Sequence, residues 1–311
     1  MKPNMRSFLI LFALTPFAVA QDGNGVTADT IAKIAEALPD AAPASPQHDR
    51  FVLVYSKTLG FRHGSIPTGA KAMQMLGEKT HAFTAIPSED PAMFDDLSKF
   101  DAVLMLNTTG DCLAPKNGEL SDEDQATLER RKRNLREFVA GGKGLAGVHS
   151  STDTFYSWKA YGDMIGGWFT GHPWHTLVPL KVDSPNHPLT KMFDANRDFE
   201  VTDEIYQFAP RSRNQSFDGY QPYSREKLRV LLSLDSGKFD VSKGSRDDKD
   251  YAISWIHTYE QGRVFYCSLG HRDEIYWNPT VLKHYLAGIQ YAIGDLKCDA
   301  QPSGDAVAVK D

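Results

Sequence analysis

The stretch Gly144-Leu145-Ala146-Gly147-Val148-His149-Ser150-Ser151 is a short apolar run that ends abruptly in polar residues. A run of this length and character is typical of a strand buried on both faces of a sheet. The charged segment before it opens with Ser121 and three acidic residues and closes at Gly141-Gly142, as helices commonly begin and end. We therefore expect a helix followed by a buried strand.

The same alternation continues toward the N-terminus. Apolar runs at 51–55, 82–86 and 101–106 predict strands, and segments that begin at Pro67 and near Met93 predict helices. Strands that alternate with helices are joined by right-handed crossovers and form parallel sheets. The first half of the chain is therefore predicted to be an α/β unit with a parallel sheet.

The second half is richer in strands. A hairpin loop is expected at Tyr259-Glu260-Gln261-Gly262, and Pro279 begins a final helix. The fold class is therefore α/β with a mostly parallel central sheet and additional strands in the second half. Those strands are predicted at 176–182, 199–208, 229–234, 251–257 and 263–268.

The two ends of the chain differ from the region between them. Residues 1–20 have the basic start, apolar run and Ala-x-Ala ending of a cleaved signal peptide, which predicts an exported protein in the periplasm or medium. Residues 21–49 are interpreted as a linker and 295–311 as a flexible tail. A single domain over 50–294 is expected, because no Pro/Gly/Ser-rich joint divides it.

The composition excludes several classes of protein. The formal net charge of −6 gives no electrostatic basis for binding nucleic acid or anionic lipid, and nothing after residue 20 is apolar enough to cross a membrane. Three cysteines are too few for a disulfide scaffold and form no Cys-x-x-Cys motif. We expect a small-molecule ligand. The sequence is compatible with a monomer and with a homo-oligomer.

Unusual polar residues follow the predicted strands. In open α/β sheets, ligands bind beyond the carboxyl ends of the strands, so these residues are candidates for a site. His149 stands where a doubly wound hydrolase has its nucleophile, but its surroundings lack the Gly-x-Ser-x-Gly pattern. The candidates at strand ends are Lys57, His63, Asn107, Thr109, Asp111, His149, Asp153, His271 and Glu274.

Further candidates come from the second half. His172 and His175 have a spacing that can place two ligands on one helical turn, which Pro173 disrupts. Glu204 is either a general base, with a pKa raised if Tyr206 and Phe208 desolvate it, or half of an exposed pair with Asp203. Trp255 is a candidate for contact with substrate.

At these residues the sequence resembles the ThuA-like (trehalose utilisation) family, over about 51–293. The match rests on motifs that occur in the right order and are specific only together. They are Ser56-Lys57-Thr58-Leu59-Gly60-Phe61-Arg62-His63, Leu106-Asn107-Thr108-Thr109-Gly110-Asp111, Gly147-Val148-His149-Ser150-Ser151-Thr152-Asp153-Thr154, Trp168-Phe169 with His172-Pro173, Thr202-Asp203-Glu204-Ile205-Tyr206, Tyr251-Ala252-Ile253-Ser254-Trp255-Ile256-His257, Gly262-Arg263-Val264-Phe265-Tyr266 and Leu269-Gly270-His271.

The resemblance implies a flavodoxin-like three-layer fold related to class I glutamine amidotransferases. His149 occupies the amidotransferase nucleophile position, so glutaminase activity should be absent. The family is linked to disaccharide use, particularly the turnover of 3-keto-glycosides made by sugar oxidoreductases. Some members are thought to carry a metal, and a divalent ion such as zinc has His149, His172 and His271 as candidate ligands here.

These observations predict an enzyme that isomerises or cleaves keto-glycosides by acid/base chemistry, with metal assistance as an option. His149 or Glu204 would transfer the proton, and His271, His63 and Asn107 would stabilise the enediolate oxygen. Two alternatives stay open. One is a carbohydrate-binding protein without turnover that uses tryptophans Trp168, Trp174, Trp255 and Trp277, and the other is a hydrolase with Ser150 as nucleophile.

Overall fold

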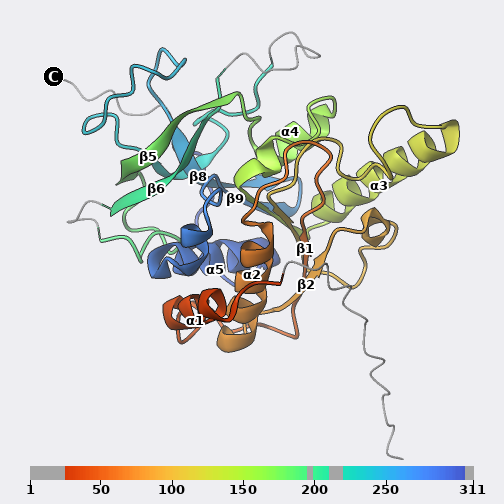
Figure 1. The fold of residues 1–311 in the computed structure, drawn as a ribbon, viewed down its shortest axis with the longest axis horizontal. Coiled ribbons are helices and arrows are strands. Elements are labelled where there is room, and N and C mark those ends of the chain that lie inside the picture. Colours follow the sequence, from red (N-terminus) through yellow and green to blue (C-terminus); the bar gives the residue numbers. More distant parts are fainter. Residues whose placement is uncertain (1–24, 195–198, 210–219, 305–311) are drawn as a thin grey trace, which may run out of the picture.

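The computed structural model describes residues 25–194, 199–209 and 220–304 (Figure 1). Within them nine strands form one sheet in the order β2-β1-β3-β4-β9-β8-β7-β5-β6. The strands are β1 Phe51–Tyr55, β2 Thr84–Ser88, β3 Ala102–Leu106, β4 Gly144–Val148, β5 Gly171–Val182, β6 Phe199–Gln207, β7 Arg229–Leu234, β8 Ala252–Tyr259 and β9 Gly262–Cys267.

The sheet consists of two halves. β2, β1, β3, β4 and β9 are mutually parallel, whereas β9, β8, β7, β5 and β6 pair antiparallel. The helices are α1 Ala28–Ala37, α2 Ile66–Thr80, α3 Asp122–Ala140, α4 Lys159–Ile165 and α5 Pro279–Ile293, with short 3-10 turns η1 Pro91–Phe94, η2 His149–Thr152 and η3 Asp273–Trp277. The chain is therefore a mixed α/β protein.

Helices cover both faces of the parallel half. Along β1, Val52 and Val54 point into the core beneath α2 and α5, while Leu53 and Tyr55 point into the core that α3 and α4 cover. Successive side chains of a strand alternate between faces, so a run apolar at every position must be covered on both sides. Figure 1 shows α1, α2 and α5 on one side of the sheet and α3 and α4 on the other.

Several element boundaries differ from those predicted from sequence. β2 lies two residues later than the run at 82–86, because Thr84 is the residue that pairs with Phe51. The helix expected near Met93 is only the turn η1, which Asp90 caps. β5 begins at Gly171 rather than Thr176 because it pairs along β6. The short helix α4 was not predicted.

Both segments outside the predicted domain contain packed structure. The expected linker at 21–49 includes α1, which contributes the buried Ile34 to the core beneath α2, and Ala44 N–H donates to Gln290 Oε1 at 3.0 Å. In the expected tail, Ser303 N–H donates to the Leu228 carbonyl at 3.0 Å. The described parts of the two end segments, 25–49 and 295–304, are therefore attached to the domain by apolar burial and hydrogen bonds.

The predicted signal peptide at 1–20 lies outside the described residues. Among the helices that the structure does describe, none combines the length and the apolar character that crossing a bilayer requires.

Candidate functional site

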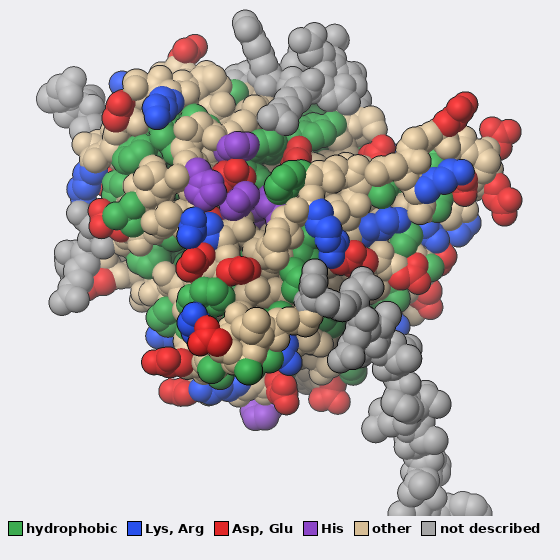
Figure 2. Space-filling model, in the orientation of Figure 1, with side chains coloured by type: hydrophobic (Ala, Val, Ile, Leu, Met, Phe, Trp, Pro, Cys, Tyr) green, Lys and Arg blue, Asp and Glu red, His purple; other side chains and the backbone are tan. Residues whose placement is uncertain are grey.

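Three histidines meet where strands of the parallel half end. His63 lies in the loop after β1, His149 begins η2 directly after β4, and His271 follows β9. β4 pairs with β9, so their carboxyl ends lie together at one edge of the sheet. Figure 2 shows histidines gathered in one group on this face, with an acidic side chain among them. The three imidazoles are thus brought together at the edge where ligands bind in open α/β sheets.

The backbone is unusual at the ends of the three strands that border the site. Asn107 after β3 has φ 52°, His149 after β4 has φ 51°, and Gly270 after β9 has φ 137°. Positive φ is uncommon for residues with a Cβ and costs free energy that the surrounding structure must offset. Here it turns the chain sharply enough to return the imidazole of His149 over the strand end.

The antiparallel half contributes a carboxylate from the middle of a strand. Glu204 and Tyr206 are two residues apart on β6 and therefore point to the same face. Glu204 Oε2 lies 3.5 Å from His149 Nε2 and 3.3 Å from His271 Nδ1, and the Tyr206 hydroxyl lies 2.9 Å from His149 Nε2. The sheet thus closes the site from its antiparallel edge.

Asp203, the neighbour of Glu204, has a separate structural role. It is fully buried, and its carboxylate accepts the backbone N–H groups of Gly270 at 2.6 Å, His271 at 3.4 Å and Arg272 at 3.1 Å. Burial raises the pKa of Asp203 in spite of these bonds. The expectation of an exposed Asp203–Glu204 pair is wrong, because one carboxylate anchors the His271 loop and the other faces the histidines.

A β-bulge directs His172 toward the same carboxylate. The β5–β6 register shifts between Gly171 and Trp174, and His175 lies directly opposite Glu204. One extra residue in the strand lets side chains three positions apart share a face. His172 Nδ1 lies 3.2 Å from Glu204 Oε1, and the His175 ring is 4.8 Å from that of His271. The two histidines belong to a strand rather than the helical turn considered from sequence.

Hydrogen bonds fix the orientation of His149. Its Nδ1 lies 2.7 Å from the Ser268 carbonyl, which can only accept, so Nδ1 carries the proton. The Nε2 of His63 lies 3.2 Å from the Nε2 of His149. His63 is held in turn by Ser150, whose Oγ lies 3.2 Å from His63 Nδ1. Two imidazoles therefore point their Nε2 atoms toward one place.

Burial and neighbouring charges shift the titration of the cluster. Burial, aided by the charges of His149 and His271, lowers the pKa of His63 to about 3. Burial alone would raise the pKa of Glu204, but contacts with His149 and His271 outweigh it and hold that pKa well below its usual value. The Glu204 carboxylate raises the pKa of His271. At neutral pH, Glu204 is thus an anion, contrary to the raised pKa expected from its aromatic neighbours.

The donor set fits a divalent metal. One donor atom each from His63, His149, Glu204 and His271 lies within 4.8 Å of all the others. Zinc with bonds of about 2.0–2.1 Å in a tetrahedron needs donors about 3.3 Å apart, and three of the six separations, 3.2, 3.5 and 3.3 Å, match that value. His271 Nδ1 is also buried without a hydrogen bond of acceptable geometry. His63 takes the place that the sequence analysis gave to His172.

Two of the predicted residues support the site from behind. Asn107 Nδ2 donates to Ser65 Oγ and to the Gly270 carbonyl, both at 3.0 Å, and is fully buried. Its amide is therefore occupied in holding the Gly270 turn, which argues against direct contact with an enediolate oxygen. Thr109 accepts from Gly60 N–H at 3.1 Å and donates to the Phe61 carbonyl at 2.9 Å, which fixes the loop that carries His63.

Five other predicted residues make their contacts elsewhere. Lys57 donates to the Ala114 carbonyl at 2.6 Å, and Asp111 lies in the same turn, where its carbonyl accepts from Ala114. Asp153 accepts from the Tyr156 hydroxyl, the buried Trp255 donates to the Ile165 carbonyl, and the exposed Glu274 pairs with Arg272. A position after a strand predicts the edge of the sheet, but not the direction of each side chain.

Sequence reasoning missed the roles of Tyr206, Asp203 and Ser65. Tyr206 could have been found from its two-residue spacing to Glu204, which places both on one face of a strand. Asp203 and Ser65 gave no such signal, because they act on backbone groups of the distant Gly270 turn, where Ser65 Oγ donates to the Gly270 carbonyl at 2.8 Å.

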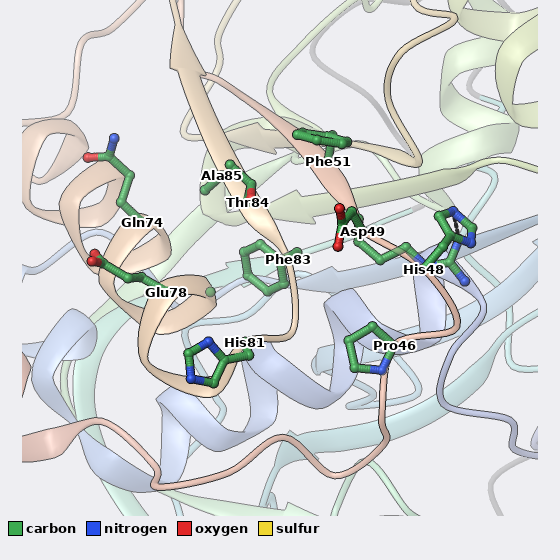
Figure 3. Close-up of a pocket in the computed structure, with 12 residues that line it drawn as sticks. Pro46, His48, Asp49, Phe51, Gln74, Glu78, His81, Phe83, Thr84 and Ala85 are labelled. Atoms are coloured by element: carbon green, nitrogen blue, oxygen red, sulfur yellow. Dashed lines mark hydrogen bonds between the residues drawn. The ribbon is translucent and has the colours of Figure 1, made fainter. Parts of the chain in front are cut away.

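A hollow away from the histidine cluster lies at the opposite end of β1 (Figure 3). It has a volume of about 600 Å³ and is bordered by His48, Asp49, Glu78, His81 and other residues of α2 and β2. These four side chains are exposed, and His48 with Arg50 contacts Asp101 instead of converging on a common point. This hollow therefore lacks the ordered donors of the histidine cluster.

Comparisons with known proteins identify the family and the fold. A family model described as trehalose utilisation (ThuA) matches residues 51–292. A putative ThuA-like protein from Bacteroides uniformis ATCC 8492 is similar in structure, with a TM-score of 0.59 and 20% identity over 80% of this chain and 94% of that one. One from Parabacteroides merdae ATCC 43184 has a TM-score of 0.53 and 14% identity over 82% and 99%. At these identities the two structures establish the fold alone. No curated protein matches.

Proposed function

This chain belongs to the ThuA (trehalose utilisation) family, and from that premise we propose that it is a sugar-active enzyme that cleaves keto-glycosides by acid/base chemistry. The observation that carries the proposal is the convergence of His63, His149 and His271 on the Glu204 carboxylate. Several buried titratable groups with shifted pKa values at one point are typical of catalytic sites. A role in disaccharide catabolism, with glutaminase activity absent, follows from the family and from His149 at the nucleophile position.

The proton transfer is assigned to Glu204 and His172. A ketone at C3 of a pyranose acidifies the C2–H bond, so a base can remove that proton. Glu204 Oε1 lies 3.2 Å from His172 Nδ1 and orients the imidazole ring. The His172 side chain is 46% exposed, which leaves its Nε2 accessible to substrate. As Nε2 takes the proton, the C–H electron pair forms a C1=C2 bond and the C1–O bond breaks. The imidazolium then returns the proton to the departing oxygen.

The other three imidazoles face the keto oxygen in this proposal. His271, with its raised pKa, donates to the negative charge that develops there. His149 is held by Ser268 and Tyr206, so it is oriented before substrate binds. When bound, a divalent cation such as zinc held by His63, His149, Glu204 and His271 would supply Lewis-acid polarisation of that oxygen.

Two finer statements belong to the same proposal. The order β2-β1-β3-β4-β9 follows the 2-1-3-4-5 order of flavodoxin-like sheets, and helices on both faces support a three-layer description of this half. Export, with cleavage after residue 20, is proposed from the signal-peptide pattern of the sequence.

A non-catalytic carbohydrate-binding protein is the weaker alternative. That hypothesis depended on tryptophans that stack on sugar rings, but Trp168, Trp174 and Trp255 are buried in the core. A binding protein also has little use for three imidazoles and a carboxylate at one point.

A serine hydrolase is favoured by one contact, the 3.2 Å between Ser150 Oγ and His63 Nδ1. Against it, the other ring nitrogen of His63 faces His149 instead of a carboxylate, and Ser150 is fully buried. A serine-directed covalent inhibitor that labels Ser150 would favour this alternative over ours.

The proposal is tested by incubating the purified chain with a 3-keto-glucoside and following the sugar by NMR. We expect loss of the C2 proton signal and release of the aglycone, abolished in His149→Ala. A chelator arm shows whether a metal takes part. Shifts that report binding without any conversion would contradict the enzyme and favour the binding protein.

A further inference from the structure

Phe61 exposes an aromatic ring at the edge of the histidine cluster. Phe61 is 65% exposed, and among the described residues the other exposed large hydrophobic residues are Phe51 and Leu177. The Phe61 ring centroid lies 4.8 Å from that of His63 at an interplanar angle of 78°. Figure 2 shows hydrophobic side chains bordering the group of histidines. What distinguishes Phe61 from other exposed hydrophobic residues is therefore its position, in direct ring contact with a histidine of the cluster.

The loop that carries Phe61 is fixed on both sides of the ring. Leu59 N–H donates to the Thr109 carbonyl at 2.9 Å, and Thr109 Oγ1 donates to the carbonyl of Phe61 itself at 2.9 Å. On the other side, the guanidinium of Arg62 donates to both oxygens of Glu89 at 3.0 and 2.8 Å. The exposed ring therefore has a backbone that is positioned before any ligand arrives.

A fixed, exposed aromatic ring beside polar catalytic groups matches the two-sided chemistry of a sugar. A pyranose with equatorial hydroxyls presents carbon–hydrogen bonds on its ring face and hydroxyls at its rim. The ring face packs on an aromatic side chain by dispersion and burial, while the rim reaches hydrogen-bonding groups. An open-chain polyol has no such flat apolar face.

We propose that Phe61 is the stacking platform of a pyranose subsite beside His63, His149, Glu204 and His271. This inference rests on the proposed function and deepens it, because it names the ring form of the sugar as what the site recognises. Phe61 contacts the carbon–hydrogen face of the ring and leaves the reacting carbons to the imidazoles. Its contribution is to binding and orientation, so its removal raises KM and changes kcat little.

The kinetic test compares Phe61→Ala and Phe61→Trp on a 3-keto-glucoside. We expect KM to rise about tenfold in Phe61→Ala, the size of a typical aromatic contact, with kcat within about twofold. Phe61→Trp should keep KM near that of the wild type. The matched control is Phe51→Ala, an exposed phenylalanine at the opposite end of β1. An unchanged KM in Phe61→Ala, or an equal rise in Phe51→Ala, would overturn the inference.

A binding test separates this inference from the proposed reaction. Saturation-transfer NMR with methyl glucopyranoside, irradiated at aromatic frequencies, should transfer to the ring C–H protons in the wild type and weaken in Phe61→Ala. Glucitol, the open-chain control, should receive no transfer. If the wild type shows this pattern without converting the 3-keto-glucoside, the reaction fails and the subsite stands. If conversion occurs and transfer is the same in Phe61→Ala, the subsite fails and the reaction stands.

Discussion

The two halves of the sheet contribute to the site in different ways. In the parallel half, His63, His149 and His271 stand in loops just beyond strand ends. In the antiparallel half, His172 and Glu204 lie within β5 and β6, directed by a bulge and by strand alternation. The rule that ligands bind beyond the carboxyl ends of strands therefore identifies only the residues of the parallel half. The other side follows from which face of an antiparallel strand each residue occupies.

The largest expected effect tests whether both halves are needed. His149→Ala and Glu204→Gln each remove one contribution, and we expect kcat for 3-keto-glucoside cleavage to fall about 10²–10⁴-fold in either variant. Because the groups act as a unit, the double variant should be little worse than each single one. A buried histidine outside the site gives the control, His187→Gln. Activity that survives in Glu204→Gln would mean that the carboxylate of the antiparallel half is not required.

A second variant tests the connection between the halves. Asp203→Asn weakens the anchor through which β6 holds three backbone N–H groups of the His271 loop. Residues that orient ligands from behind typically contribute about 10–100-fold to activity or metal affinity, and we expect a loss of this size. Thr202→Val, on the exposed position before it, is the control. Equal activity in Asp203→Asn and Thr202→Val would mean that the loop positions itself.

A third prediction concerns the seam between the halves. His284 of α5 contacts Ser254 of β8 at 2.8 Å and donates to the Leu189 carbonyl at 2.7 Å, and burial lowers its pKa to about 4. Below the unfolded-state pKa of about 6.5 the unfolded chain gains a proton that native His284 does not, so stability falls as the pH drops from about 6.5 to 4.

His284→Gln should reduce that loss by about 2 kcal/mol between pH 7 and pH 5, measured by urea unfolding at each pH. The same pH dependence in the variant and the wild type would show that His284 does not carry it. Two separate unfolding transitions would mean that the halves are independent units.

The smallest effect is expected at Lys57, which sequence reasoning assigned to the substrate. Its ammonium group donates to the Ala114 carbonyl, and burial lowers the pKa of Lys57. Lys57→Met should leave KM within about twofold, because the contact it loses is within the loop. A tenfold rise in KM would mean that Lys57 contacts the substrate. Its position after a strand would then have been enough to identify a ligand contact.

The sequence predicted the parallel half better than the antiparallel half, for physical reasons. β1 and β4 are buried on both faces, so their apolar runs mark their exact bounds, and His149 follows directly. The extension of β5 back to Gly171 depends on a bulge and on pairing with β6, which a local pattern does not encode. The packing of the segment after α1 and of residues near 303 depends on contacts with Gln290 and Leu228, far away in the chain.

The site was predicted in the same uneven way. His149, Glu204 and His271 were named as a catalytic set, and the structure brings them together. Glu274 lies three residues after His271 and Trp255 lies inside β8, but both side chains have partners outside the site. Side-chain direction depends on the backbone, as the positive φ of His149 demonstrates. That angle is unusual for a histidine and could not be read from residue type.

The most direct test of the central claim, that the two halves build one site, is a zinc titration by calorimetry. The metal-free chain, Glu204→Gln from the antiparallel half and His271→Ala from the parallel half would each be measured. We predict one tight site per chain, and at least tenfold weaker binding in both variants. Binding should release protons, because His271, which is paired with Glu204, must lose its proton to bind the ion. Binding in Glu204→Gln as tight as in the wild type would contradict the account.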